Sequence, residues 1–278
     1  YKVVSGGVES AVHHLHAAPK DYKPVRFVVG GDSQGHPEIF GPIVTQMLAF
    51  EPFFMLHVGD SVQTPLMGSS YDPFRSELFD AIRPMAHEVP FYESIGNHEK
   101  ESQDWYNLVS YPGGIMDAEH PKWESTYSFR YGNVFVLVIN TNQLLLSSGS
   151  LAEFVEKAVK SEAAQTATWR VAIGHEPGYT NAWSPGDCGY DGYPLVRAWF
   201  LPLLGQNKFH AYFSGHTHNY QRGQSDKVLT IITGGLGGGL DEFCKSWPEI
   251  QVSRYVHHHL QVEAGCSTMK IRTIDTEG

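Results

Sequence analysis

The chain has 278 residues, of which 13% are aromatic and 18% are charged, and its formal net charge at pH 7 is −10. The aromatic content and the modest charge exclude a predominantly disordered chain, and the longest apolar stretch, Val134 to Ile139, is too short to span a bilayer. The negative net charge disfavours a nucleic-acid binder that relies on a basic face.

The first third of the chain alternates between strand-like and helix-like runs. Apolar residues at helical spacing, such as Ile39, Ile43 and Met47, predict helices, and short apolar runs that end in glycine predict strands. The predicted elements are the strand Val25–Val29, the helix Pro37–Phe50, the strand Phe53–Val58, the helix Pro73–His87 and the strand Pro90–Ile95.

The middle of the chain predicts a hairpin, because Tyr127–Tyr131 and Val134–Ile139 flank a Gly-Asn turn. The remaining predicted elements are a helix from Leu151 to about Ala164 and the strands Trp169–Ile173, Phe209–Phe213, Val228–Thr233, Arg254–Glu263 and Thr268–Ile274. This order predicts an α/β fold with crossover helices and C-terminal strands that pair antiparallel. No linker or repeat divides the chain, so we expect an N-terminal arm over residues 1–24 and a single domain over residues 25–278.

Three cysteines, Cys188, Cys244 and Cys266, show no repeated pair spacing. They do not form a zinc framework or a dense disulfide scaffold, and both one disulfide with one thiol and three thiols are open. The sequence begins at Tyr1 without a basic and then apolar leader, which fits a mature exported form or a trimmed chain. An exported location, periplasmic or extracellular, is favoured over the cytoplasm, and the sequence indicates no oligomeric state.

Polar side chains gather at the ends of five predicted strands. They are, in order, Asp32, Asp60, Asn97 with His98, His175, and His216 with His218. Open α/β sheets bind ligands beyond the carboxyl ends of their strands, and the neighbouring glycines allow tight turns and close approach of a ligand. Carboxylate, amide oxygen and imidazole together suit zinc, iron or manganese, and a carboxylate that bridges two cations suits hydrolysis of phosphate esters.

Each of these motifs alone has an ordinary structural explanation. A Gly-Asp pair after a strand is usually a turn, and Asn97 with the nearby Glu99 could begin a capped helix. The pair His216 and His218 is more specific, because an extended backbone points residues i and i+2 the same way. The five strand ends in combination favour a metal site.

The ordered motifs resemble the calcineurin-like metallophosphoesterases, and within them the purple acid phosphatase branch. The motifs are Gly31-Asp32, Gly59-Asp60, Gly96-Asn97-His98-Glu99, Gly174-His175 and Gly215-His216-Thr217-His218. The resemblance implies a four-layer α/β/β/α sandwich with mixed sheets. It also implies two divalent or mixed-valence metal ions, of iron, zinc or manganese, held in one catalytic domain.

Carried over by position, the resemblance gives each residue a role. Asp60 would bridge the two metals, and His98 would stabilise the attacked phosphate or protonate the leaving oxygen. The remaining ligands would be Asp32 and His218 for the first metal, and Asn97, His175 and His216 for the second. The implied reaction is in-line attack by a metal-bound hydroxide on a phosphorylated small molecule or other phosphate ester. A phosphomonoesterase is favoured, and the alternatives are a phosphodiesterase, acting on cyclic nucleotides or other diesters, or a catalytically weakened phosphate- or metal-binding protein of the same fold.

Two positions depart from the family pattern at the first metal. Purple acid phosphatases have a metal-binding tyrosine three residues after the bridging aspartate, where this chain has Gln63, and other branches have a histidine where this chain has Gln34. Either amide oxygen is a candidate extra ligand. A neutral amide binds a trivalent ion less well than a tyrosinate, so we expect no purple colour and a divalent or weakly loaded first site.

Three further residues are candidates for binding substrate. Tyr179 and Trp183 follow the fourth strand end and could line a pocket for a flat leaving group, and Arg222 could contact a phosphate. Exposed loop aromatics and a structural ion pair are the ordinary alternatives. The run His257 to His259 lies in a predicted strand, so its side chains alternate between faces and cannot all bind one ion.

Overall fold

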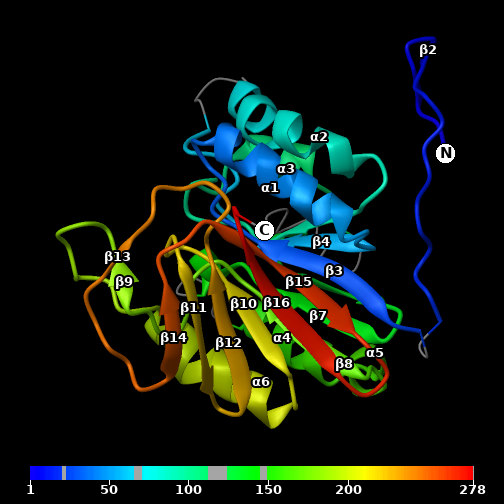
Figure 1. The fold of residues 1–278 in the computed structure, drawn as a ribbon. Helices are drawn as coiled ribbons and strands as arrows, with labels where there is room; N and C mark the ends of the chain where they lie inside the picture. The colour runs from blue at the N-terminus through cyan, green and yellow to red at the C-terminus, as the bar shows by residue number, and fades with distance from the viewer. Residues whose placement is uncertain (21–22, 66–70, 112–123, 145–148, 278) are drawn as a thin grey trace.

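The computed structural model describes residues 1–20, 23–65, 71–111, 124–144 and 149–277 (Figure 1). One sheet has the order β16-β15-β3-β4-β5, with strands β3 (Val25–Gly30), β4 (Phe54–His57), β5 (Phe91–Glu93), β15 (His258–Ala264) and β16 (Met269–Asp275). The other has the order β14-β11-β12-β10-β8-β7-β6, with strands β6 (Tyr127–Tyr131), β7 (Val134–Val138), β8 (Trp169–Ile173), β10 (Ala211–Ser214), β11 (Tyr220–Ser225), β12 (Val228–Thr233) and β14 (Ile250–Arg254). Two small sheets pair β1 (Val4–Ser5) with β2 (Val8–Glu9) and β9 (Ala182–Trp183) with β13 (Glu242–Phe243).

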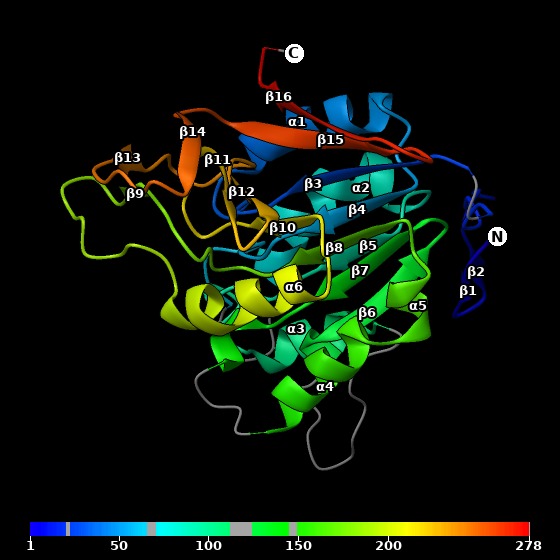
Figure 2. The same ribbon diagram turned by 90° about the horizontal axis from the view of Figure 1, so that it is seen from below.

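Helices cover the outer faces of both large sheets (Figure 2). On one side lie α1 (Pro37–Ala49), η1 (Phe74–Phe79) and α2 (Asp80–Ala86); on the other lie α4 (Ser150–Val159), α5 (Glu162–Gln165), η4 (Val196–Phe200) and α6 (Leu201–Gln206). The short helices α3 (Gln103–Leu108) and η3 (Thr141–Gln143) lie in connections between strands. The expected four-layer sandwich with mixed sheets is confirmed.

Strand alternation explains the layering, because successive side chains of a strand point to opposite faces. In β3, Phe27 and Val29 join the apolar core between the two sheets, whereas Val28 packs against α1 and α2. In β7, Val136 faces the same central core and Leu137 packs under α4 and α6. Strands buried on both faces therefore read as continuous apolar runs in the sequence.

Parallel pairing brings the strand ends of the site together. Strands β3, β4 and β5 are parallel to one another, and so are β7, β8, β10 and β12. The antiparallel strands lie toward the edges of each sheet: β15 and β16 beside β3, β6 beside β7, and β11 and β14 beside β12. The carboxyl ends of the parallel strands in the two sheets therefore carry the connections that bear the polar motifs.

The structure corrects three predicted elements. The predicted strand Arg254–Glu263 is wrong, because β14 and β15 are separate strands in different sheets. The predicted helix from Leu151 breaks after Val159, where the side chain of Ser161 accepts the amide of Ala164 and begins α5. The predicted helix Pro73–His87 begins with the π-helical turns of η1 before α2.

Several elements were not predicted from the sequence. They are β1, β2, α3, η3, β9, η4 with α6, β11 and β13, of which η4 and α6 do present apolar residues at helical spacing. Among the described residues, no helix combines the length and apolarity needed to cross a membrane.

Candidate metal centre

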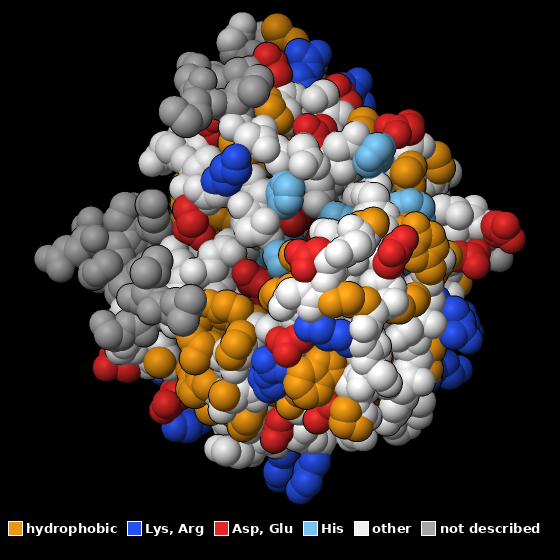
Figure 3. Space-filling model, turned by 90° about the vertical axis from the view of Figure 1, so that its left-hand side faces the viewer, with side chains coloured by type: hydrophobic (Ala, Val, Ile, Leu, Met, Phe, Trp, Pro, Cys, Tyr) orange, Lys and Arg blue, Asp and Glu red, His pale blue; other side chains and the backbone are white. Residues whose placement is uncertain are grey.

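Six of the predicted ligands converge from the two large sheets. Asp32, Asp60 and Asn97 follow β3, β4 and β5, whereas His175 follows β8 and His216 and His218 follow β10. Histidine and carboxylate side chains meet on one face of the molecule (Figure 3). The structure thus brings together the ends of strands that are far apart in sequence.

One group of donors centres on His175. Its Nε2 lies 3.0 Å from Oδ2 of Asp60 and 3.0 Å from Oδ1 of Asn97. Nδ1 of His216 lies 2.7 Å from the same Asn97 oxygen and 3.1 Å from Nε2 of His175. One ligand atom each from Asp60, His175 and His216 lies within 4.8 Å of the others, which suits a single cation.

The other group corresponds to the first metal of the sequence analysis, and we call it the first donor group; it joins Asp32 and His218 to the same Asp60. One ligand atom from each of these three residues again lies within 4.8 Å of the others. Nε2 of His218 is 3.5 Å from Oδ1 of Asp32, and Oδ2 of Asp32 is buried without a hydrogen-bond partner among the described residues. A buried carboxylate oxygen without a partner is costly unless a cation meets it. The donor sets therefore fit two metal ions that share Asp60.

Backbone strain accompanies three of these residues. Asp32, Asp60 and His216 have φ angles of 58°, 56° and 68°, in the left-handed region that non-glycine residues seldom adopt. A Cβ at Gly96 would overlap Oδ1 of Asp60, so glycine is required there. Strained backbone of this kind persists only where the surrounding structure holds it in place. Here it accompanies side chains that converge on the same donor groups.

The imidazoles are oriented by backbone and carboxylate partners. Nδ1 of His175 lies 2.9 Å from the carbonyl of Val58, and Nδ1 of His218 lies 2.7 Å from the carbonyl of Gly239. Each Nδ1–H therefore donates to a carbonyl and leaves Nε2 to face the carboxylates. Asp241, which the sequence analysis missed, accepts the backbone amide of His218 at 2.8 Å.

Burial and charge pairing perturb the protonation of the site. Burial by itself would raise the pKa of Asp60, but His175 lowers it well below its usual range. Burial would lower the pKa of His218, and Asp32 raises it to about 9. Burial, reinforced by His175, lowers the pKa of His216 to about 3. Such opposed shifts are typical of functional sites.

His98 lies beside the donors without joining either group. Its backbone amide donates to Oδ1 of Asp60 at 2.8 Å, and its Nδ1 lies 2.7 Å from the carbonyl of Gln63. The Nδ1–H donates to that carbonyl, so Nε2 remains available. His98 is half-buried, which leaves its ring accessible to a ligand.

Glu99 ties the turns of two strand ends together. Its buried carboxylate accepts the backbone amides of Gly96 at 2.6 Å, Asp60 at 3.1 Å, Ser61 at 2.7 Å and Val62 at 3.3 Å. Burial next to Asp60 raises the pKa of Glu99 to about 8. The capped-helix alternative for this motif is wrong, because α3 begins later with Ser102 as its N-cap.

The candidate extra ligands have different surroundings. Gln34 is 2% exposed, its Nε2 lies 3.3 Å from Nε2 of His218, and its Oε1 is buried without a partner among the described residues. Gln63 is exposed, and its contribution to the site is the backbone carbonyl that binds His98. The structure therefore brings Gln34, rather than the side chain of Gln63, to the first donor group.

The three candidates for binding substrate also differ in their distance from the donor groups. The ring of Trp183 lies 5.1 Å from that of His216, at the edge of the centre. Tyr179 instead packs against Trp247, with ring centroids 5.1 Å apart. Arg222 is exposed on β11 and lines an open groove that also contains Tyr255.

Comparison with known proteins agrees with this geometry. Residues 25–220 match the family described as calcineurin-like phosphoesterase. The chain is 26% identical over 235 residues to "Probable inactive purple acid phosphatase 27" of Arabidopsis thaliana, covering 72% of this chain and 37% of that protein. It is 24% identical over 272 residues to "Tartrate-resistant acid phosphatase type 5" of Sus scrofa, covering 86% of this chain and 77% of that protein.

A solved structure supports the same fold. The purple acid phosphatase PPD1 from yellow lupin seeds superposes with a TM-score of 0.74 at 18% identity, covering 97% of this chain and 55% of that one. The chain thus spans 37% of the Arabidopsis relative and about half of the lupin chain.

Proposed function

The chain belongs to the calcineurin-like phosphoesterase family, on its purple acid phosphatase-like branch, and from this premise we propose that it hydrolyses phosphate monoesters at a dinuclear metal site. The observation that carries the proposal is the position of Asp60, which belongs to both donor groups. A carboxylate shared in this way can bridge two cations, the arrangement suited to displacement at phosphorus.

The proposed ligands follow from the donor groups. Asp32 and His218 would hold the first metal with Asp60, and Gln34 is the proposed additional ligand because its buried Oε1 has no partner among the described residues. The second metal would be held by Asp60, with the three residues Asn97, His175 and His216 completing its site. Bound cations of zinc, iron or manganese lower the pKa of a water molecule and offset negative charge that develops on the phosphoryl group.

The protein's own side chains would orient the site and supply a proton to the leaving group. Asp60 holds its geometry through the His98 amide, and Glu99 clamps the loop that follows Asp60. The available Nε2 of His98 is the proposed proton donor to the leaving oxygen, since Nδ1–H is committed to the Gln63 carbonyl. Because His175 outweighs the effect of burial and lowers the pKa of Asp60, Asp60 stays an anion that orients the site rather than a base.

A catalytically weakened binding protein is the second candidate. Gln34 and Gln63 stand where related branches carry stronger ligands, and the name of the Arabidopsis relative describes that protein as probably inactive. On either candidate, we expect iron-loaded protein to lack purple colour, because no tyrosine stands at the position of Gln63.

The disulfide between Cys188 and Cys244 supports an exported location. Disulfides persist in oxidising compartments and are rare in the cytosol. We therefore propose that the protein works outside the cytoplasm. Its proposed substrate is a phosphorylated small molecule.

One experiment tests the proposed activity. Metal content per chain is measured by elemental analysis, and hydrolysis of p-nitrophenyl phosphate and of bis-p-nitrophenyl phosphate is measured before chelation, after chelation and after metal return. The proposal expects about two metals per chain and chelator-sensitive turnover that is faster on the monoester. Faster diester turnover would favour a phosphodiesterase, and metal binding without turnover on either ester would favour the binding protein.

A further inference from the structure

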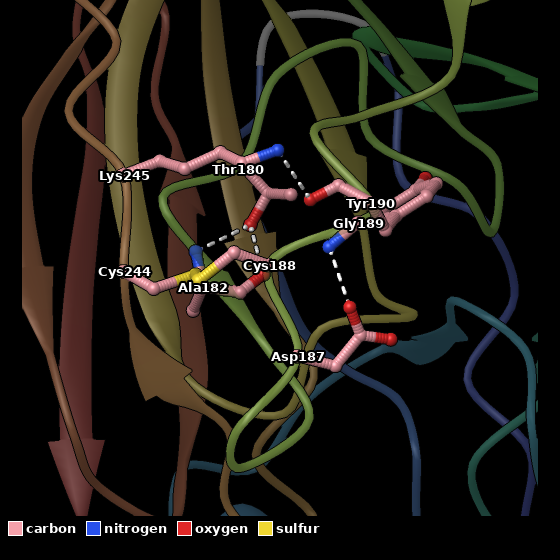
Figure 4. Close-up of a disulfide and its surroundings, with 8 residues drawn as sticks. All are labelled: Thr180, Ala182, Asp187, Cys188, Gly189, Tyr190, Cys244 and Lys245. Carbon is pink, nitrogen blue, oxygen red and sulfur yellow. Dashed lines mark hydrogen bonds between the residues drawn. A yellow bond between two sulfur atoms is a disulfide. The ribbon is translucent and has the colours of Figure 1, made fainter.

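Two aromatic side chains stand next to the proposed second metal site. Trp183 belongs to β9, which pairs with β13, and Tyr190 lies in the loop that the Cys188–Cys244 disulfide joins to the end of β13 (Figure 4). We call Trp183 and Tyr190 the aromatic wall. Both side chains are partly exposed, so their rings are accessible to a ligand.

The loop that carries the aromatic wall is fixed by several contacts. The backbone carbonyl of Asn181 accepts the amides of Cys244 at 2.8 Å and Lys245 at 3.0 Å, and its side-chain oxygen accepts the amide of Trp247 at 2.6 Å. The ammonium group of Lys245 donates to the carbonyl of Tyr190 at 3.2 Å (Figure 4). The two rings are therefore held in place before any ligand arrives.

The wall contacts the metal-ligand candidate directly. The ring centroid of Trp183 lies 5.1 Å from that of His216, the Tyr190 ring lies 4.8 Å from it, and the two wall rings lie 4.6 Å from each other. Nδ1 of His216 points at Asn97. Only the imidazole ring of His216 therefore separates the aromatic wall from the proposed metal site.

Tyr190 contributes its ring, rather than its hydroxyl, to the wall. The hydroxyl is buried, and none of the described contacts directs it toward the proposed metal ligands. The wall therefore meets a ligand through its two aromatic rings.

We propose that the aromatic wall binds the leaving group of the substrate and that the preferred substrates are phosphate monoesters of flat aromatic alcohols. This inference rests on the proposed phosphoesterase function. A phosphoryl group at the centre leaves its ester substituent free to extend past His216, where a flat ring meets the rings of Trp183 and Tyr190. Aromatic pairs of this kind strengthen binding by about threefold to tenfold.

Binding of two phosphonates separates this role from simple support of His216. Phenylphosphonate and methylphosphonate carry the same anionic head, and neither has a P–O–C ester bond to cleave. Their affinities for metal-loaded protein are measured by calorimetry, together with metal content, in the wild type, Trp183→Leu and Trp247→Leu. Trp247 is the matched control, because it lies in the same disulfide-linked segment but its ring packs on Tyr179.

The inference expects the wild type to bind phenylphosphonate more tightly than methylphosphonate. Trp183→Leu should weaken phenylphosphonate by about threefold to tenfold and leave methylphosphonate and metal content unchanged, whereas Trp247→Leu should preserve the preference. Tyr190→Phe, which keeps the ring, should preserve the preference for phenylphosphonate, because the phenyl group brings no hydrogen-bond partner for the lost hydroxyl.

Several outcomes would overturn the inference. The first two are equal binding of the two phosphonates by the wild type and no binding of either phosphonate. The third is equal weakening of both phosphonates by Trp183→Leu together with loss of metal, because this result would mean that the wall only supports His216. Hydrolysis is a separate readout on the same samples. A preference for phenylphosphonate without turnover on any ester would count against the proposed function and leave the aromatic wall as a binding site.

Discussion

The side-chain amide of Gln34 lies against His218, with Nε2 of the glutamine 3.3 Å from Nε2 of the imidazole. The other amide atom, Oε1, is buried without a partner among the described residues, as is Oδ2 of Asp32. These two unsatisfied oxygens belong to residues that both contact His218, which supports the proposal that Gln34 is a ligand of the first metal. A neutral amide oxygen is a weaker ligand than imidazole for zinc or iron.

Gln34→Ala should lower the affinity of one of the two metal sites by about tenfold or more and leave the other unchanged. The physical reason is the loss of an amide that contacts His218 and carries a buried oxygen without a partner among the described residues. Calorimetric titration of the metal-free protein with zinc or manganese measures both sites. Gln63→Ala is the matched control, because that side chain is exposed and its backbone carbonyl remains. Equal losses in the two variants would contradict the assignment of Gln34.

His98→Ala should lower kcat by about 10²- to 10⁴-fold while the metal content stays at the wild-type level. Because a proton donor matters most for a basic leaving group, the loss should be larger with phenyl phosphate than with p-nitrophenyl phosphate. Steady-state kinetics on the two esters check this, with elemental analysis on the same samples. Equal losses on both esters would rule out proton donation, and a loss of metal would make His98 a ligand.

Much of the centre could be predicted from the sequence because its residues sit at a recurring place in the fold. Asp60, His175 and His216 each follow an apolar strand and a glycine, and parallel strands bring their carboxyl ends to one edge. The supporting groups could not be predicted in this way. Asp241 reaches His218 from a loop 23 residues away, and that contact depends on tertiary structure rather than on a local pattern.

Dependence on tertiary contacts also explains why some strands were not predicted. β9 and β13 have only two residues each, and they are held by pairing between distant segments rather than by an apolar pattern. Arg254–Glu263 reads as one strand because no glycine or proline interrupts it, but the chain leaves one sheet at Arg254 and enters the other at His258. The alternation of apolar and polar residues along a strand does not predict which sheet the strand joins.

Glu99→Gln should destabilise the fold by about 2–4 kcal/mol. The substituted amide keeps one oxygen, but its N–H₂ group opposes either the backbone amides of Gly96 and Asp60 or those of Ser61 and Val62. Chemical denaturation of the metal-free protein above pH 8, where Glu99 is ionised, measures this cost without a contribution from metal binding. Glu263→Gln, a change of the same type on β15, is the control and should stay within about 0.5 kcal/mol of the wild type. A similar, small effect in both variants would show that Glu99 does not clamp the two turns.

Removing the disulfide with Cys188→Ser and Cys244→Ser should lower the free energy of unfolding by about 2–4 kcal/mol, because the bond closes a long loop. The two cysteines are 56 residues apart in the sequence. The release of the loop should also reduce the preference for phenylphosphonate, since Tyr190 lies two residues from Cys188. Thermal unfolding and phosphonate binding by the double variant provide the check, with Cys266→Ser as a control outside the disulfide. An unchanged phosphonate preference would show that the other loop contacts suffice to hold the wall.

Acid should destabilise the fold through His258 and His259, which are buried in β15. Burial is the largest cause that lowers the pKa of each to about 4; the carbonyl of Val256 and Asp275 oppose it at His258, and a neighbouring histidine adds a smaller lowering at both residues. The unfolded chain, with a histidine pKa near 6.5, binds more protons than the folded chain between pH 6.5 and 4, so stability is full above this window and falls through it. Each histidine should cost about 2 kcal/mol between pH 7 and pH 5. His259→Gln should therefore flatten the pH dependence of urea unfolding with chelator present, whereas the exposed His14→Gln should not. An unchanged slope in His259→Gln would mean that His259 does not remain neutral in the folded protein.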